Sequence, residues 1–213
     1  MWLFSYVKGL LLGTIAYSIG TIMDITISRK SFMKILENIP NLYDQALTKI
    51  KRNMLLISPI VYCINDQYLI DKTSYNIQYG NVLGILMIHG VGYYIVHRSM
   101  HVVSFLRKYH NFHHEFDEYI MPSIGNAVTT EEFLTAYIAP FIFSAWLLKP
   151  NETSFVIPIA LISVFNNIIH CKELENVKWS KYLVAPKQHL EHHSVRTKHY
   201  AAPIMNLDYF IEN

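Results

Sequence analysis

Apolar residues gather into five runs along the chain, at 2–23, 53–64, 77–96, 133–148 and 155–169. Only the first and third runs approach the roughly 20 residues that a bilayer-spanning helix needs. The last two runs are short and are separated by a polar turn at 149–152, so they predict a helical hairpin that crosses the membrane and returns. The second run contains Pro59 and gives the weakest signal, which fits either a fifth crossing or an interfacial helix.

Composition supports a membrane setting. Hydrophobic residues make up 52% of the 213 residues and charged residues only 16%, whereas ordinary soluble domains carry roughly 25% charge. We therefore predict an all-α membrane protein, a short transmembrane helical bundle that forms a single domain over residues 1–213. The formal charge of +2 is too small to indicate a nucleic-acid partner. The two cysteines, Cys63 and Cys171, give neither a disulfide framework nor a zinc pattern.

The distribution of basic residues predicts the orientation. If all five runs cross, 24–52, 97–132 and 170–213 share one side of the membrane, and 65–76 and 149–154 lie opposite. The 24–52 segment holds six basic residues, against Lys72 and Lys149 on the opposite side, so its side is predicted to be cytosolic: Arg29, Lys30, Lys34, Lys49, Lys51 and Arg52. The glycosylation sequon that begins at Asn151 falls on the opposite side, so close to the membrane that we expect it to be unused.

Eight of the eleven histidines form three motifs. The first is an H-x-x-x-H and the other two are H-x-x-H-H: His97 and His101; His110, His113 and His114; His189, His192 and His193. Residues three or four apart lie on one face of a helix, so each motif is expected to direct two or more imidazoles at one point. Buried imidazoles without partners cost free energy, which a metal ion offsets by accepting their lone pairs.

Eight histidines exceed what one ion can use, since an ion takes roughly four to six ligands. The motifs therefore predict two metal ions. The carboxylates near the motifs in sequence are expected at the surface or hydrogen-bonded to ligands: Glu115, Asp117, Glu118, Glu131, Glu132 and Glu191. His89 lies inside the third apolar run, outside the motifs, and is interpreted as structural or as lining a pathway.

The ordered set of motifs resembles the fatty acid hydroxylase/sterol desaturase superfamily of membrane di-iron enzymes. The resemblance rests on His97-Arg98-Ser-Met-His101, on His110-Asn-Phe-His113-His114-Glu-Phe, on the lone His170, and on Pro186-Lys-Gln-His189-Leu-Glu-His192-His193. It covers about residues 90–210. One departure is His199, which stands where the family usually has asparagine, in His199-Tyr200-Ala201.

The resemblance implies a dimetal centre that activates O2 to oxidise a lipid, by hydroxylation or desaturation of a sterol or fatty acyl chain. Its ligands would be the eight motif histidines and His170, with His199 as an additional ligand or a hydrogen-bonding neighbour. The resemblance also implies two iron ions, with zinc as an alternative occupant. It implies an external electron donor such as cytochrome b5 with its reductase, and a place in the endoplasmic reticulum with the motifs facing the cytosol.

Other functions fit parts of the pattern. A non-redox membrane hydrolase could use the same imidazoles around zinc, and a metal-binding protein without oxygenase activity would keep them as well. Transport sites lie near the bilayer midplane, whereas these motifs follow the apolar runs. A haem needs one axial histidine on each face, not triples.

Overall fold

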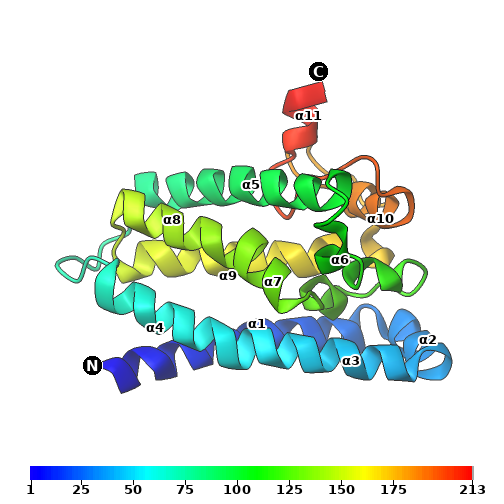
Figure 1. Ribbon diagram of the computed structural model, residues 1–213, viewed down its shortest axis with the longest axis horizontal. Helices are drawn as coiled ribbons and strands as arrows, with labels where there is room; N and C mark the ends of the chain where they lie inside the picture. The colour runs from blue at the N-terminus through cyan, green and yellow to red at the C-terminus, as the bar shows by residue number, and fades with distance from the viewer. Residues whose placement is uncertain (213) are drawn as a thin grey trace.

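The computed structural model describes residues 1–212, which form helices and no β-strand (Figure 1). Four helical segments are long and apolar enough to cross a membrane: α1 (Trp2–Thr26), α5 (Tyr79–Val102), Thr130–Leu148 and α9 (Glu152–Ile169). The all-α membrane bundle expected from the apolar runs is thereby confirmed, and the four helices indicate an integral membrane protein.

Successive long segments run antiparallel (Figure 1). After α1 and the short α2 (Arg29–Asn38), the chain returns along α1 through α3 (Pro40–Lys51), η1 (Arg52–Ile57) and α4 (Ser58–Tyr68). The Thr130–Leu148 segment consists of α7 (Thr130–Glu132), η4 (Phe133–Ile138) and α8 (Ala139–Leu148), and it forms a hairpin with α9. Loops 24–28, 103–129 and 170–185 therefore lie at one end of the bundle, as expected if all five apolar runs cross.

Pro59 does not break the second apolar run. The run is continuous through η1 and α4, although this segment is not among the four that could cross by length and composition. A proline ring clashes with the carbonyl four residues earlier in a regular α-helix. For Pro59 and Pro140 those carbonyls belong to Leu55 and Ala136, which lie in the π-helical turns η1 and η4. The wider π turn accommodates each proline without ending the helix.

Glycines bring α1 against η1 and α4. A Cβ atom on Gly13 would lie 2.0 Å from the carbonyl oxygen of Met54, and one on Gly9 would lie 2.8 Å from the Cα of Pro59. Both neighbours are backbone atoms, which cannot move aside. The close contact of these helices therefore depends on glycine at both positions.

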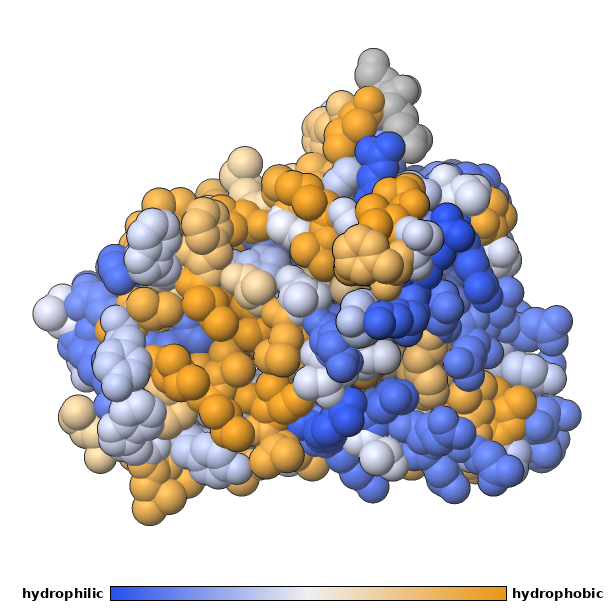
Figure 2. Space-filling view, in the orientation of Figure 1, coloured by the Kyte–Doolittle hydropathy of each residue, from blue (hydrophilic) through white to orange (hydrophobic). Residues whose placement is uncertain are grey.

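The surface divides into an apolar and a polar part (Figure 2). Hydrophobic residues cover the part formed by the long helices, and hydrophilic residues gather at the end that carries α2, α6 and α10. At the opposite end, exposed aromatic residues lie where α1 begins (Trp2), α4 ends (Tyr68) and α5 begins (Tyr79). Aromatic side chains favour the membrane–water interface, so this end fits one boundary of the bilayer.

Short helices cap the hydrophilic end: α6 (Arg107–His110), η2 (His113–Phe116), η3 (Pro122–Asn126), η5 (Lys172–Leu174), α10 (Pro186–Val195) and α11 (Leu207–Glu212). Of these elements, η2 and η3 share one hydrophobic core with α5 and α9, which includes Tyr93, Phe116, Ile124 and Ile169. This core fixes α5 and η2, which carry the first histidine motif and part of the second.

The side chain of Asn151, the acceptor residue of the sequon, is fully buried. Its Oδ1 accepts a hydrogen bond from the N–H of Ser154 at 2.9 Å and so caps α9. Its Nδ2, the atom that glycosylation would modify, donates to the carbonyl of Asn76 at 2.6 Å. This placement supports the expectation that the sequon is unused.

Candidate metal centre

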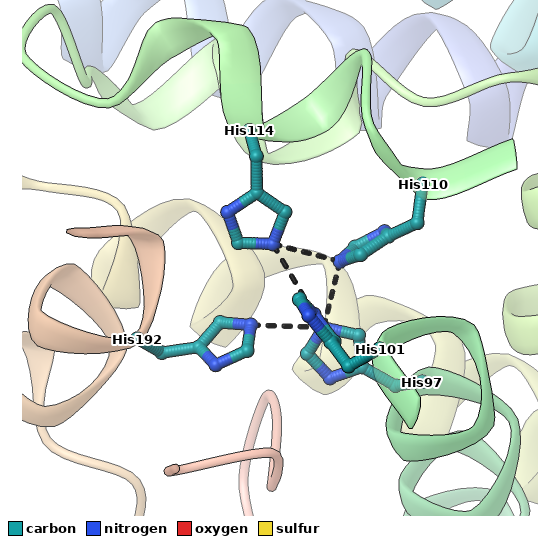
Figure 3. Close-up of side chains that lie close together, drawn as sticks. All are labelled: His97, His101, His110, His114 and His192. Carbon is teal, nitrogen blue, oxygen red and sulfur yellow. Dashed lines mark hydrogen bonds between the residues drawn. The ribbon is translucent and has the colours of Figure 1, made fainter. Parts of the chain in front are cut away.

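Nine histidines meet at the capped end of the bundle in two groups. The first group has five members, which converge in Figure 3: His97, His101, His110, His114 and His192. The second has four: His113, His170, His189 and His193. Within each group the ligand atoms all lie within 4.8 Å of one another, so each group could hold a metal ion. These nine are the residues that the sequence predicted as ligands.

The motifs divide between the groups in a regular way. Pairs four residues apart stay together, as His110 with His114 and His189 with His193 do. Adjacent histidines separate, so that His113 and His193 enter the second group while their neighbours enter the first. Each motif thus directs two imidazoles at one group, as its spacing predicts. Successive residues in a helix project about 100° apart, so the remaining histidine of each H-x-x-H-H motif enters the other group.

Main-chain carbonyls and one carboxylate fix the orientation of most rings. Five Nδ1 atoms have such a partner: His97 with Tyr200 O (2.8 Å), His110 with Glu132 Oε1 (2.7 Å), His114 with His193 O (3.3 Å), His170 with Asn166 O (2.7 Å) and His192 with Lys198 O (2.8 Å). A carbonyl oxygen can only accept, so Nδ1 carries the proton in those rings. Their Nε2 atoms are then left with a free lone pair.

These lone pairs point at one another. In the first group the Nε2 of His110 lies 2.9 Å from the Nε2 of His97 and 2.9 Å from that of His114. In the second group the Nε2 of His170 faces the Nε2 of His189 at 2.9 Å, and the Nδ1 of His189 has no hydrogen-bond partner that would fix its tautomer. Nitrogens at this distance with no proton between them repel each other, and a cation at the centre of each group removes the repulsion. The residues present therefore fit a metal ion in each group.

Burial supports the same conclusion. It lowers the pKa of His170 to about 4, although the carbonyl of Asn166 partly opposes the shift. Burial, and then the charge of neighbouring rings, lowers the pKa of His113, His189 and His193 well below its ordinary value. The rings are thus neutral near pH 7, which is the form that binds metal. Neither ring nitrogen of His193 has a hydrogen-bond partner in the protein.

Glu132 is the carboxylate closest to the site. It is buried, and its Oε1 accepts from the Nδ1 of His110. The Thr129 hydroxyl accepts a hydrogen bond from the Glu132 N–H, so the start of α7 fixes this residue. The other nearby carboxylates are exposed or partly exposed, as expected: Glu115, Asp117, Glu118, Glu131 and Glu191. Of the two places expected for these carboxylates, Glu132 takes the one hydrogen-bonded to a ligand histidine, His110, 22 residues earlier in the chain.

Gly125 allows the second group to form. A Cβ atom at this position would lie 2.5 Å from the Nδ1 of His170 and 3.0 Å from the Nδ2 of Asn166. The loop that contains Gly125 can therefore pack directly on the His170 ring only because no side chain intervenes.

The two remaining histidines lie outside both groups. His199 has a left-handed backbone conformation (φ 59°), and its Nε2 lies 3.2 Å from the Oε2 of Glu191, at the periphery of the site. His89 is fully buried within α5 and packs against Phe141, with ring centroids 4.4 Å apart. Its interpretation as structural agrees with this position.

Fold and site together define a class: helical membrane proteins with two groups of imidazoles, each able to hold a metal ion, at one end of the bundle. The sequence model of the fatty acid hydroxylase family matches residues 82–213, which is more than half of the chain and includes all nine histidines. The chain belongs to the fatty acid hydroxylase family, as its motifs indicated. No curated protein and no solved structure matches it significantly. Membership implies an oxidoreductase that acts on lipids.

Proposed function

We propose that this protein is an O2-dependent lipid oxidase that hydroxylates or desaturates its substrate at a di-iron centre. The observation that carries the proposal is the pair of converging imidazole groups at the end of an apolar bundle. Imidazole binds iron well, and the family acts on lipids. When bound, the two iron ions would supply activation of O2 for oxidation of an unreactive C–H bond.

The chain's own residues would hold and orient the metals. Nine histidines provide the ligand atoms, and the carbonyls of Tyr200, Asn166 and Lys198 hold three of the rings in the productive tautomer. With cations bound beside it, the carboxylate of Glu132 would be ionised and would supply negative charge next to the first group. Eight of the nine rings are buried, so the site excludes bulk water.

The metal end would face the cytosol, in the endoplasmic reticulum, where an external donor such as cytochrome b5 and its reductase supplies electrons. Two observations support this orientation. The basic 24–52 segment lies at the same end as the histidines, and positively charged loops favour the cytosolic side. The basic side chains Arg107, Lys108, Lys172 and Lys187 belong to the same end and provide charge for an acidic donor.

The proposal is tested by turnover under 18O2. Purified protein is loaded with iron, supplied with NADH and a cytochrome b5 chain, and offered a mixture of fatty acyl lipids and sterols, with an anaerobic reaction beside it. The expected result is 18O in a lipid alcohol, or an alkene that forms only with O2. Product that forms equally without O2 would indicate a hydrolase. No product with a fully iron-loaded protein would contradict the proposal.

A further inference from the structure

A narrow apolar cavity lies inside the bundle, enclosed by α1, η1, α4, η4, α8 and α9. Its volume is about 90 Å³, and its walls include Leu12, Val61, Phe141, Phe155 and Ile159. The polar side chains that line it include Asn126 and Asn166 on one side and Tyr62 and Asn65 on the other. A cavity of this character, inside a membrane protein, favours a hydrocarbon occupant over water.

One end of the cavity lies against the second histidine group. Asn126 and Asn166 line this end, and the Nδ2 of Asn166 donates to the Oδ1 of Asn126 at 3.1 Å. Asn166 and His170 are four residues apart, and the Asn166 carbonyl accepts from the Nδ1 of His170 at 2.7 Å. The neighbour of Asn126, Gly125, packs directly on the His170 ring. One layer of side chains therefore separates the cavity from the candidate metal site.

The opposite end is closed by a polar network. The hydroxyl of Tyr62, which lines the cavity, donates to the Oε1 of Glu152 at 2.7 Å. The same carboxylate pairs with the Nζ of Lys8 at 2.6 Å. These three side chains come from α4, α9 and α1, so they tie together the helices that form the walls. An occupant that enters from the metal end would stop at Tyr62 and Phe155.

The dimensions favour a single chain over a fused ring system. Phe155 and Asn166 both line the cavity, and their separation along α9 corresponds to roughly 16 Å at 1.5 Å per residue. The volume of about 90 Å³ is smaller than the roughly 150 Å³ cavity, known from another protein, that holds one benzene ring. A space of this volume suits a few methylene groups at the end of a single chain, and the four rings of a sterol would not fit.

We propose that this cavity binds the methyl end of the unbranched hydrocarbon chain of the lipid substrate, and that Tyr62, Phe155 and the Glu152–Lys8 pair limit the chain length. The direction of the hydrocarbon chain, which enters the cavity from the end near the histidine groups, rests on the proposed function. Much of the wall comes from α1, η1 and α4, which precede the family match at residues 82–213. The N-terminal segment would thus set the substrate range of a catalytic region common to the family.

Photolabelling tests the cavity without requiring turnover. Full-length protein in nanodiscs is irradiated with a long-chain fatty acid that carries a diazirine at its methyl end, and the labelled residues are mapped by mass spectrometry. The expected labels fall on the α4 and α9 segments around Tyr62 and Phe155, and unlabelled fatty acid of the same length abolishes them. Labels only on lipid-facing residues, or equal competition by a sterol, would overturn the proposal.

Two variants change the cavity in opposite directions. Phe155→Ala lengthens it, so that longer fatty acids should compete better for the labelled site, by roughly fourfold for each additional buried methylene. Ile159→Phe shortens it and should favour shorter chains by a similar factor. Phe143→Ala makes the same change as Phe155→Ala at a side chain that is 52% exposed on α8, and it should leave the preference unchanged. A shift of the preferred fatty acid length in the same direction in all three variants would contradict a length limit.

The outcomes separate the two proposals. Specific labelling with the predicted length dependence, but no oxidation at any iron loading, would support the cavity and reject the oxidase. Oxidation of lipid without cavity labelling, or with a chain-length preference that neither variant alters, would support the oxidase and reject the cavity.

Discussion

At the scale of single residues, the ring partners distinguish the two histidine groups. Four of the five Nδ1 partners found among residues 1–212 are main-chain carbonyls, and the fifth is the carboxylate of Glu132 on His110. A carboxylate makes the imidazole a stronger donor to a metal than a carbonyl does, because it adds negative charge. The five-histidine group should therefore depend on Glu132 for affinity, whereas the four-histidine group should not.

Replacing Glu132 by glutamine keeps an acceptor for the His110 N–H but removes the charge. We expect the metal affinity of the five-histidine group to fall roughly 10–100-fold, while the other group keeps its metal. Chelator competition followed by metal analysis measures this. Glu131→Gln removes the neighbouring, exposed carboxylate and should leave both affinities unchanged. An E132Q protein that retains both metals like the wild type would show that the contact is only structural.

His193 and His199 form a second matched pair, since His193 ends the last motif and His199 follows it closely in sequence, but the two occupy different surroundings. His193 belongs to the four-histidine group, and His199 contacts Glu191 outside both groups. His193→Ala should lower the iron content from two ions per chain to about one, and His199→Ala should leave it at two. Metal analysis after gel filtration decides the point. Loss of iron from H199A would make His199 a ligand after all.

The residue scale also shows how far sequence reasoning reaches. Spacing alone selected the eight motif histidines, because ligands four residues apart must share a helix face, and the resemblance added His170. Sequence reasoning did not assign His113 and His114 to different groups, since that assignment follows from where the other helices place their own rings. Partners such as the Tyr200 and Lys198 carbonyls leave no trace in the side-chain sequence.

At the scale of helices, the sequence predicted the long segments well, and the second run, its weakest candidate, is not among the four segments that could cross a membrane. Pro59 weakened the second run as a candidate crossing, yet the helix continues through it because a π turn absorbs the missing hydrogen bond. Such a turn depends on packing against neighbours, here the glycine face of α1. The helix propensities of the residues in this segment do not reveal that packing contact.

The glycine contact gives a prediction for α1. Gly13→Ala would place a methyl group 2.0 Å from the Met54 carbonyl oxygen, and the two helices would have to separate. We expect destabilisation of about 1–3 kcal/mol, visible as a lower thermal unfolding midpoint in detergent. Gly80→Ala is the control, because a Cβ there meets nothing within 4 Å and alanine favours helices. A midpoint in G13A equal to that of G80A would contradict the proposed close contact.

At the scale of the whole molecule, polarity and basic charge coincide. The hydrophilic end in Figure 2 carries both the histidine groups and the basic segment after α1, while exposed aromatic residues mark the far end. A catalytic centre at the membrane boundary can meet a lipid chain from one side and a soluble or anchored electron donor from the other. The orientation we propose is thus part of the mechanism as well as of the topology.

Cysteine labelling in intact cells tests that orientation. The two native cysteines, Cys63 and Cys171, are buried, so the wild-type chain provides a low background. Lys149→Cys lies on the exposed turn at the far end and Lys34→Cys on exposed α2 at the histidine end. With the histidine end in the cytosol, a membrane-impermeant maleimide should label K34C once the plasma membrane alone is permeabilised. K149C should react only after the internal membranes are opened as well, because the endoplasmic reticulum encloses that end. The reverse order would place the metal groups in the lumen and exclude a cytosolic electron donor, and equal labelling of both under the first condition would contradict a membrane-spanning bundle.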